Sequence, residues 1–221
     1  LHVQTELTAE DGAEIELTQL VAPGENALVY DEVIGHCHRS GRIVLRQVTL
    51  GHGDVYAQTG IGLDGENASF AANIGYLARK NQTLDMNLVV NHRGKKTKCE
   101  INASGALNDA AKKIFRGTID FKRGSSGSVG SEQETVLMLG EDVENKTVPV
   151  ILCSEENVVG NHGATIGELD EDTLFYLASR GISREQAENM MARAGVERLK
   201  SLIADEAFTA MIDEELGGNS I

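Results

Sequence analysis

The chain has 221 residues, which is enough for a packed core in one domain with an appendage or in two small domains. It contains 20 Lys and Arg against 34 Asp and Glu, giving a net charge of -14, and this argues against nucleic acid or an anionic membrane as a partner because phosphate binding requires clustered basic residues. No run approaches the roughly 20 apolar residues that span a bilayer.

From the start to about residue 155, apolar and polar residues alternate with the period of two that is typical of β-strands. Ile15 and Leu17 alternate with two glutamates, and Ile43 and Leu45 are expected to point inward. The same alternation recurs in the short segments 53–57, 84–90 and 117–122. Turn-forming sequences separate the strands at 23–26, 51–54 and 64–67.

The composition favours a stack of short strands with regular turns. The chain has 24 Gly, no Trp and only nine aromatic residues, 5 Phe and 4 Tyr, which suits such a stack better than an aromatic-centred sandwich. Asn-Gly dipeptides are absent and Asp-Gly occurs only at 11–12 and 64–65, which mildly disfavours a meander of hairpins. The pattern therefore leans towards a β-solenoid and leaves a sandwich or a barrel open.

After residue 165 the period becomes helical and the charge changes. Residues 1–130 hold 15 acidic and 14 basic residues, whereas residues 131–221 hold 19 and 6, so nearly all of the net charge lies in the C-terminal part. Asp170 is expected to cap a first helix and Gly181 to end it. The apolar residues of this helix are Leu174, Phe175, Leu177 and Ala178.

Ser183 and Gln186 form a capping box that predicts a second helix, which Gly195 is expected to end. Its predicted buried side consists of Ala187, Met190, Met191 and Ala194. Two further apolar groups predict a third stripe and a last short helix: Val196, Leu199, Leu202 and Ile203, then Phe208, Met211 and Ile212.

Cysteine and histidine residues form the first candidate site. Three scattered cysteines, Cys37, Cys99 and Cys153, cannot build a disulfide framework, and their odd number predicts a reducing, cytoplasmic location. On a strand, His36 and His38 would share one face while Cys37 points to the other. Two imidazoles need further ligands from elsewhere to hold a metal, so a row of half-buried polar residues is the favoured interpretation over a metal site.

Other motifs give weaker indications. The basic run Arg93, Lys95, Lys96 and Lys98 predicts either contact with an acidic partner or, as the favoured interpretation, a solvated strand edge. The Gly/Ser stretch at 124–130 lacks a Gly-x-Ser-x-Gly elbow, which favours a flexible loop over a serine hydrolase. No phosphate-binding glycine motif is present. Convergent carboxylates and aromatic platforms are scarce, which disfavours a carbohydrate-active enzyme.

The segment 160–172 is the least ordinary part of the chain, because it lies where the strand pattern gives way to the helical one. His162 stands between Asn161 and Gly163, so its ring has little side-chain bulk around it and can face a groove or a partner. On these residues alone, a turn histidine that caps the first helix is the favoured alternative.

Residues 162–183 resemble the C-terminal signature of the SufB/SufD family of iron–sulfur cluster assembly proteins. The family reads His-Gly-Ala-Thr-x-Gly and then Leu-Phe-Tyr-Leu-x-Ser-Arg-Gly-Ile, and this chain carries these residues from His162 to Ile182. Weaker similarity runs through 92–97, 115–119 and 132–139, so the resemblance covers roughly residues 85–200.

The resemblance implies a right-handed parallel β-helix over residues 1–165 and a small helical domain over residues 166–221. It implies a non-enzymatic scaffold of the SUF machinery, paired through its β-helix with a SufB-like chain or with itself as a homodimer. The helical domain would bind a SufC-like ABC ATPase. No stably bound cofactor is expected, only a transient iron–sulfur cluster at a subunit interface. The alternative is an architectural β-helix with no part in cluster assembly.

The resemblance also assigns residues. SufB-type members carry a cysteine after a Leu-Leu-Leu-Gly step and a glutamate in a His-Glu-Ala motif, where this chain has Val143 and Gly163, so it resembles SufD-type members. Gly160 stands where many of these have a helper cysteine. No residue is expected to be catalytic, and His162 is the candidate for iron or cluster assembly, since imidazole is a suitable iron ligand. The ATPase contact is expected at Leu174, Phe175, Tyr176, Arg180 and Met190.

The chain is short for this family. It opens at Leu1 without an initiator methionine or a leader pattern, which indicates a trimmed chain or a fragment. The resemblance leads us to expect that the N-terminal helical region of ordinary members is absent here, either through trimming or because the chain is a minimal relative.

Overall fold

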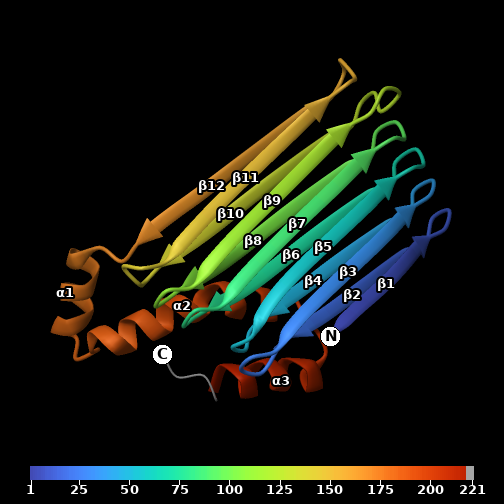
Figure 1. The fold of residues 1–221 in the computed structure, drawn as a ribbon. Coiled ribbons are helices and arrows are strands. Elements are labelled where there is room, and N and C mark those ends of the chain that lie inside the picture. The colour runs from blue at the N-terminus through green and yellow to red at the C-terminus, as the bar shows by residue number, and fades with distance from the viewer. Residues whose placement is uncertain (218–221) are drawn as a thin grey trace.

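The computed structural model describes residues 1–217, which form twelve β-strands followed by three α-helices, arranged as in Figure 1. The odd-numbered strands form one six-stranded sheet and the even-numbered strands form another. Neighbouring strands in each sheet are parallel. The chain therefore winds as a parallel β-solenoid of six coils, each with one strand in each sheet, which confirms the expected mainly β fold.

The strands are β1 (His2–Ala9), β2 (Glu14–Val21), β3 (Leu28–Cys37), β4 (Arg42–Thr49), β5 (Asp54–Leu63), β6 (Ser69–Ala78), β7 (Thr83–His92), β8 (Lys98–Leu107), β9 (Lys112–Phe121), β10 (Val129–Met138), β11 (Glu144–Cys153) and β12 (Val159–Glu168). The helices are α1 (Glu171–Ser179), α2 (Arg184–Lys200) and α3 (Glu206–Gly217). The last four residues of the predicted helical domain, 218–221, lie outside the described part of the chain.

The core fills the space between the two sheets. Paired residues lie 26 to 32 positions apart, as in the pairs Tyr30 with Tyr56 and Ile114 with Lys146. Because side chains alternate along a strand, every second residue of a coil points inward, where it stacks on the equivalent residue of the next coil. The inward residues of β7 are Leu84, Met86, Leu88 and Val90, all buried. Ile43 and Leu45 are also fully buried, as predicted.

The Gly/Ser stretch at 124–130 forms the turn between β9 and β10, and the prediction of a flexible loop there is wrong. Ser125 and Ser128 are fully buried. The Ser128 hydroxyl accepts a hydrogen bond from the Thr97 backbone amide at 3.0 Å, and the two hydroxyls lie 2.7 Å apart. Thr97 belongs to the equivalent turn of the preceding coil, so hydrogen bonds between stacked turns order this segment.

Helix α2 lies across the even-numbered sheet, below the strands in the view of Figure 1. Val196 and Leu199 form a second core cluster with residues of that sheet, among them Leu77 and Ala106. The prediction that Gly195 ends the helix is wrong, because α2 continues to Lys200. A Cβ at Gly195 would lie 2.9 Å from the Ser104 carbonyl oxygen, so glycine at this position allows the helix to approach the sheet closely.

The predicted caps are confirmed, but the predicted buried side of α2 is confirmed only for Ala187 and is wrong for its three other residues. Asp170 accepts a hydrogen bond from the Thr173 amide, and Ser183 and Gln186 form the reciprocal capping box. Met190, Met191 and Ala194 are exposed, whereas the buried residues of α2 are Ala187, Ala192, Val196 and Leu199. Contact with the sheet determines which side of α2 is buried, and a helical period alone does not specify that contact.

Within residues 1–217 no helix is both long and apolar enough to cross a membrane.

Candidate functional site

His162 lies in the middle of β12, at the open end of the β-helix. Among the described strands, β12 pairs only with β10, so no further coil covers the interior of this last one. A Cβ at Gly160 would lie 3.1 Å from side-chain atoms of Phe121 and Ile151, which places Gly160 on the interior side of the strand. His162 follows two residues later and therefore faces the same side.

The imidazole of His162 is exposed at this open end. It takes part in no hydrogen bond or ion pair among the residues that the structure describes. The alternative of a helix-capping histidine is wrong, since Asp170 caps α1 and His162 stands eight residues earlier in a strand. Both ring nitrogens are consequently available to a ligand or a partner.

Glu132 is the register partner of His162 on the neighbouring strand β10, one coil deeper. It is only 4% exposed, and its carboxylate lies against Gly117 of the opposite sheet, where a Cβ would collide with it. Glu132 has no hydrogen-bond or ion-pair partner among the described residues. Burial, and then the charge of nearby Glu134, raises the pKa of Glu132 to about 7.

Glu134, two residues along the same strand, is by contrast fully satisfied. The ammonium group of Lys113 donates a hydrogen bond to Oε1 of Glu134 at 2.5 Å, and both side chains are completely buried. The Tyr76 hydroxyl donates to the same oxygen at 3.0 Å, and the Thr147 hydroxyl donates to Oε2 at 2.6 Å. Burial lowers the pKa of Lys113, although Glu134 opposes this shift. The interior of the last coils therefore holds two carboxylates and one ammonium group.

The donor atoms at this end match part of a metal site. An imidazole nitrogen and a carboxylate oxygen are ligand types that iron accepts. No group of three or more His, Cys, Asp and Glu side chains within residues 1–217 is placed to hold a metal ion. A metal ion bound at this end would need further ligands from outside the described chain.

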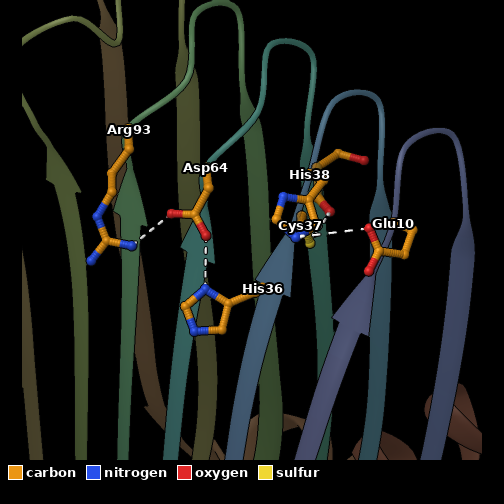
Figure 2. Close-up of polar contacts among 7 residues, drawn as sticks. Glu10, His36, Cys37, His38, Asp64 and Arg93 are labelled. Atoms are coloured by element: carbon orange, nitrogen blue, oxygen red, sulfur yellow. Dashed lines mark hydrogen bonds and ion pairs between the residues drawn. The ribbon is translucent and has the colours of Figure 1, made fainter.

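The predicted His36-Cys37-His38 motif lies at the end of β3, with His38 just beyond the strand, far along the chain from His162, and its residues do not converge (Figure 2). Asp64 Oδ2 lies 2.7 Å from Nδ1 of His36, and Arg93 donates a hydrogen bond to the other oxygen of Asp64 at 2.7 Å. These hydrogen bonds outweigh the effect of burial and lower the pKa of Asp64. His38 lies 4.0 Å from a Glu10 oxygen. The favoured interpretation, a row of polar residues, agrees with this arrangement.

The cysteines are placed differently from one another. Cys37 and Cys99 are buried, and burial raises the pKa of each thiol to about 12, which keeps both protonated. Cys153 is exposed, and its thiol donates to the Glu155 carbonyl at 3.1 Å. Cys153 is the last residue of β11. The residue of β11 that is in register with Gly117, against which Glu132 lies, is Pro149, so Cys153 is four positions further along the strand.

The basic run lies on turns and on an inner strand, so the prediction of a strand edge is wrong. Lys98 begins β8, which lies between β6 and β10. Arg93 and Lys96 form ion pairs with acidic residues of the preceding coil, Asp64 and Glu66. These pairs lie on the solvent side of stacked turns, where they join neighbouring coils.

The residues predicted to contact an ATPase divide into exposed and buried ones. Phe175 is 77% exposed, Tyr176 55% and Met190 59%, which is unusual for large apolar side chains. The Arg180 guanidinium stacks over the Tyr176 ring, 5.2 Å from its centroid. Leu174 is the buried residue of α1. Met191, Leu202 and Met211 are exposed as well and extend the apolar surface.

Sequence reasoning missed Glu132, Glu134 and Lys113. The alternation of residues along the strand could have identified the two glutamates. Glu132 and Glu134 lie on the same face of the strand as apolar Val136. Strand alternation therefore predicts two carboxylates in the interior. Nothing in the sequence indicates that Lys113, which is 37 positions from Tyr76 and 21 from Glu134, meets both of them.

Comparison with known proteins agrees with the resemblance. Residues 1–195 match the family model described as "SUF system FeS cluster assembly, SufBD core domain". The iron-sulfur cluster assembly protein SufD of Bacillus subtilis (strain 168) is 30% identical over 142 residues, 64% of this chain and 32% of that protein. SufD of Escherichia coli (strain K12) is 26% identical over 168 residues, 76% of this chain and 40% of that protein. The chain thus matches well under half the length of these curated relatives.

Proposed function

Since the chain belongs to the SufBD family of the SUF iron–sulfur cluster assembly system, we propose that it is a SufD-like, non-catalytic scaffold component of that machinery. The observation that carries this proposal is the placement of His162. It is an exposed imidazole to which no residue of 1–217 forms a hydrogen bond, at the open end of the β-helix and in the part of the chain that matches the family model. We infer that iron or a nascent cluster is handled at this residue.

A neutral imidazole near pH 7 is a ready iron ligand and a proton acceptor. The incomplete donor set around His162 supports assembly at a subunit interface, because a second chain would complete the coordination. Strands β11 and β12 lie at the edges of their sheets, where unpaired backbone groups can bind another chain. The second chain is a SufB-like partner or another copy of this chain, and the free cysteines suit the reducing cytoplasm.

The exposed apolar residues of α1 and α2 support a second contact. Met190 projects from α2, which packs on the β-helix through other residues, and Phe175 and Tyr176 project from α1, which contacts α2, so all three are exposed to a partner protein. We infer that a SufC-like ABC ATPase docks there. Replacing both Phe175 and Tyr176 with Ala should prevent co-purification with the ATPase, whereas His162→Ala should leave it intact.

The test of the iron-handling role is complementation in cells that depend on the SUF system. His162→Ala should abolish maturation of an iron–sulfur enzyme at a normal protein level. His36→Ala, which removes another exposed histidine of the β-helix, should have no effect. Full maturation with His162→Ala would refute the proposed role. An architectural β-helix without a role in assembly predicts that result, together with no ATPase binding.

A further inference from the structure

We propose that Glu132 is a second iron ligand, which together with His162 holds a ferrous ion at the open end of the β-helix. This inference deepens the proposed function and rests on it. It starts from a buried carboxylate that the rest of the chain does not explain: Glu132 is 4% exposed and has no hydrogen-bond or ion-pair partner among the described residues.

The geometry places Glu132 and His162 next to each other. They are register partners on adjacent parallel strands, whose backbones lie about 4.8 Å apart. Both side chains are on the interior side of the even-numbered sheet. Two donors on one metal ion lie on the order of 3 Å apart, which rotation about the side-chain torsions of these residues can reach. The Glu132 carboxylate now lies against Gly117 of the opposite sheet, in space that a Cβ at that position would fill.

The charges of the interior favour a cation at this position. Lys113 forms its ion pair with Glu134, which also accepts hydrogen bonds from Tyr76 and Thr147. Within residues 1–217, no Lys or Arg side chain forms an ion pair with Glu132. A buried carboxylate is strongly unfavourable unless it is protonated or paired with a cation, so a divalent ion at the open end would supply the missing partner.

The donor types narrow the choice of ion. One imidazole nitrogen and one carboxylate oxygen suit a borderline divalent transition metal such as Fe²⁺, whereas Ca²⁺ and Mg²⁺ prefer oxygen ligands alone. Cys99 on β8 is in register with Gly130, two positions before Glu132, and it is buried, so it is not part of this donor set. The remaining coordination positions face the open end, where sulfide, water or a second chain can occupy them.

The experiment uses the full chain and Co²⁺ as a spectroscopic probe for Fe²⁺, without oxygen. The wild-type chain should bind one Co²⁺ with visible ligand-field absorption. Glu132→Gln, which preserves size, and His162→Ala should each weaken binding by on the order of tenfold to a hundredfold or more, because losing a direct ligand exceeds the loss of an outer hydrogen bond. Glu132→Asp, which keeps the charge, should bind with an altered spectrum.

Glu100→Gln is the matched control, since Glu100 is an exposed carboxylate on the neighbouring strand β8. It should bind Co²⁺ like the wild type, and circular dichroism should show that all variants are folded. Binding by Glu132→Gln at wild-type affinity would overturn the role of Glu132 and leave that of His162. No Co²⁺ binding by the wild-type chain would also overturn this inference, whereas the complementation result for His162→Ala decides the proposed function separately.

Discussion

The two ends of the β-helix bury their carboxylates in different ways. Near the first coil, Asp31 is buried, and the amide groups of Gln19 and Gln47 donate to its two oxygens at 3.4 and 2.8 Å. In the last coils, Glu134 is satisfied by Lys113, but Glu132 beside it has no partner. The fold can therefore satisfy a buried carboxylate with neutral side chains, and the solenoid does not require an unpaired one.

The coils between the ends show what stability alone requires. Their interior is filled mainly by stacked aliphatic residues such as Leu45, Ile74 and Leu88, whose burial stabilises the fold by about 25 cal/mol per Å². Ion pairs in such an interior contribute little net stability because desolvation opposes their attraction. The charged end is thus better explained by binding than by folding.

The largest effect is expected from Lys113→Ala. It removes the ammonium group from a completely buried pair and leaves the charge of Glu134 without a cation, so the free energy of unfolding should fall by about 3–5 kcal/mol. Lys112→Ala is the matched control, because Lys112 is half exposed and pairs with Glu144 at 2.7 Å on the surface. It should lose less than about 1 kcal/mol in urea unfolding. Equal losses for both variants would remove the distinction between the charged interior and the surface.

An intermediate effect is expected from pH, through a buried ring in the fourth coil. His92 is 0% exposed, with Nδ1 2.7 Å from the Thr97 hydroxyl, and burial lowers its pKa from 6.5 to about 4, with Asp120 opposing. The unfolded chain takes up this proton more readily than the folded one. The contribution of the neutral His92 ring to the free energy of unfolding is therefore fully present above pH 6.5. It is lost as the pH falls towards 4, and the loss is about 3 kcal/mol.

The measurement for His92 is the free energy of unfolding at pH 7.5 and at pH 4.5, compared between the wild type and His92→Gln. The wild type should lose more stability on acidification than the variant. His36→Gln, at an exposed histidine, should lose as much as the wild type. A variant with His92→Gln that is as acid-sensitive as the wild type would show that other groups cause the loss.

The smallest effect is expected from Gly117→Ala. The added methyl group collides with the Glu132 carboxylate and should lower the free energy of unfolding by about 1–3 kcal/mol. Adding Glu132→Ala should restore most of this loss, which a double-mutant cycle would measure as coupling. Gly60→Ala, in the same sheet but with no neighbouring atom within 4 Å of the new Cβ, is the control. Additive effects of the first two substitutions would place Glu132 elsewhere.

Local patterns predicted much of this fold. The period of two identified the strands, and Asp170, Ser183 and Gln186 identified where two helices begin, because alternation and capping depend on neighbouring residues. The signature around His162 singled out the residue that we propose as the site. These features are all encoded within a few positions of one another.

The errors concern contacts between distant residues. Gly195 was predicted to end a helix, but its close approach to Ser104, about ninety positions away, keeps it within α2. Ser128 was predicted to lie in a flexible loop, but a hydrogen bond to Thr97 orders it. Glu132 escaped notice because its significance depends on having no partner, and only the assembled coils show this. The surroundings of these three residues depend on contacts between coils or between a helix and the sheet. A short stretch of sequence does not contain that information.

The course of α2 across the even-numbered sheet bears on how the molecule unfolds. In a simple solenoid each coil contacts only its neighbours, so the ends can fray one coil at a time. Here α2 contacts β4, β6 and β8, and α3 contributes Ile212 and Leu216 to the same cluster. Those strands belong to the second, third and fourth coils, so one helix contacts three successive coils. Native-state hydrogen exchange should therefore show the strands under α2 opening together, while β11 and β12 open separately and at lower free energy.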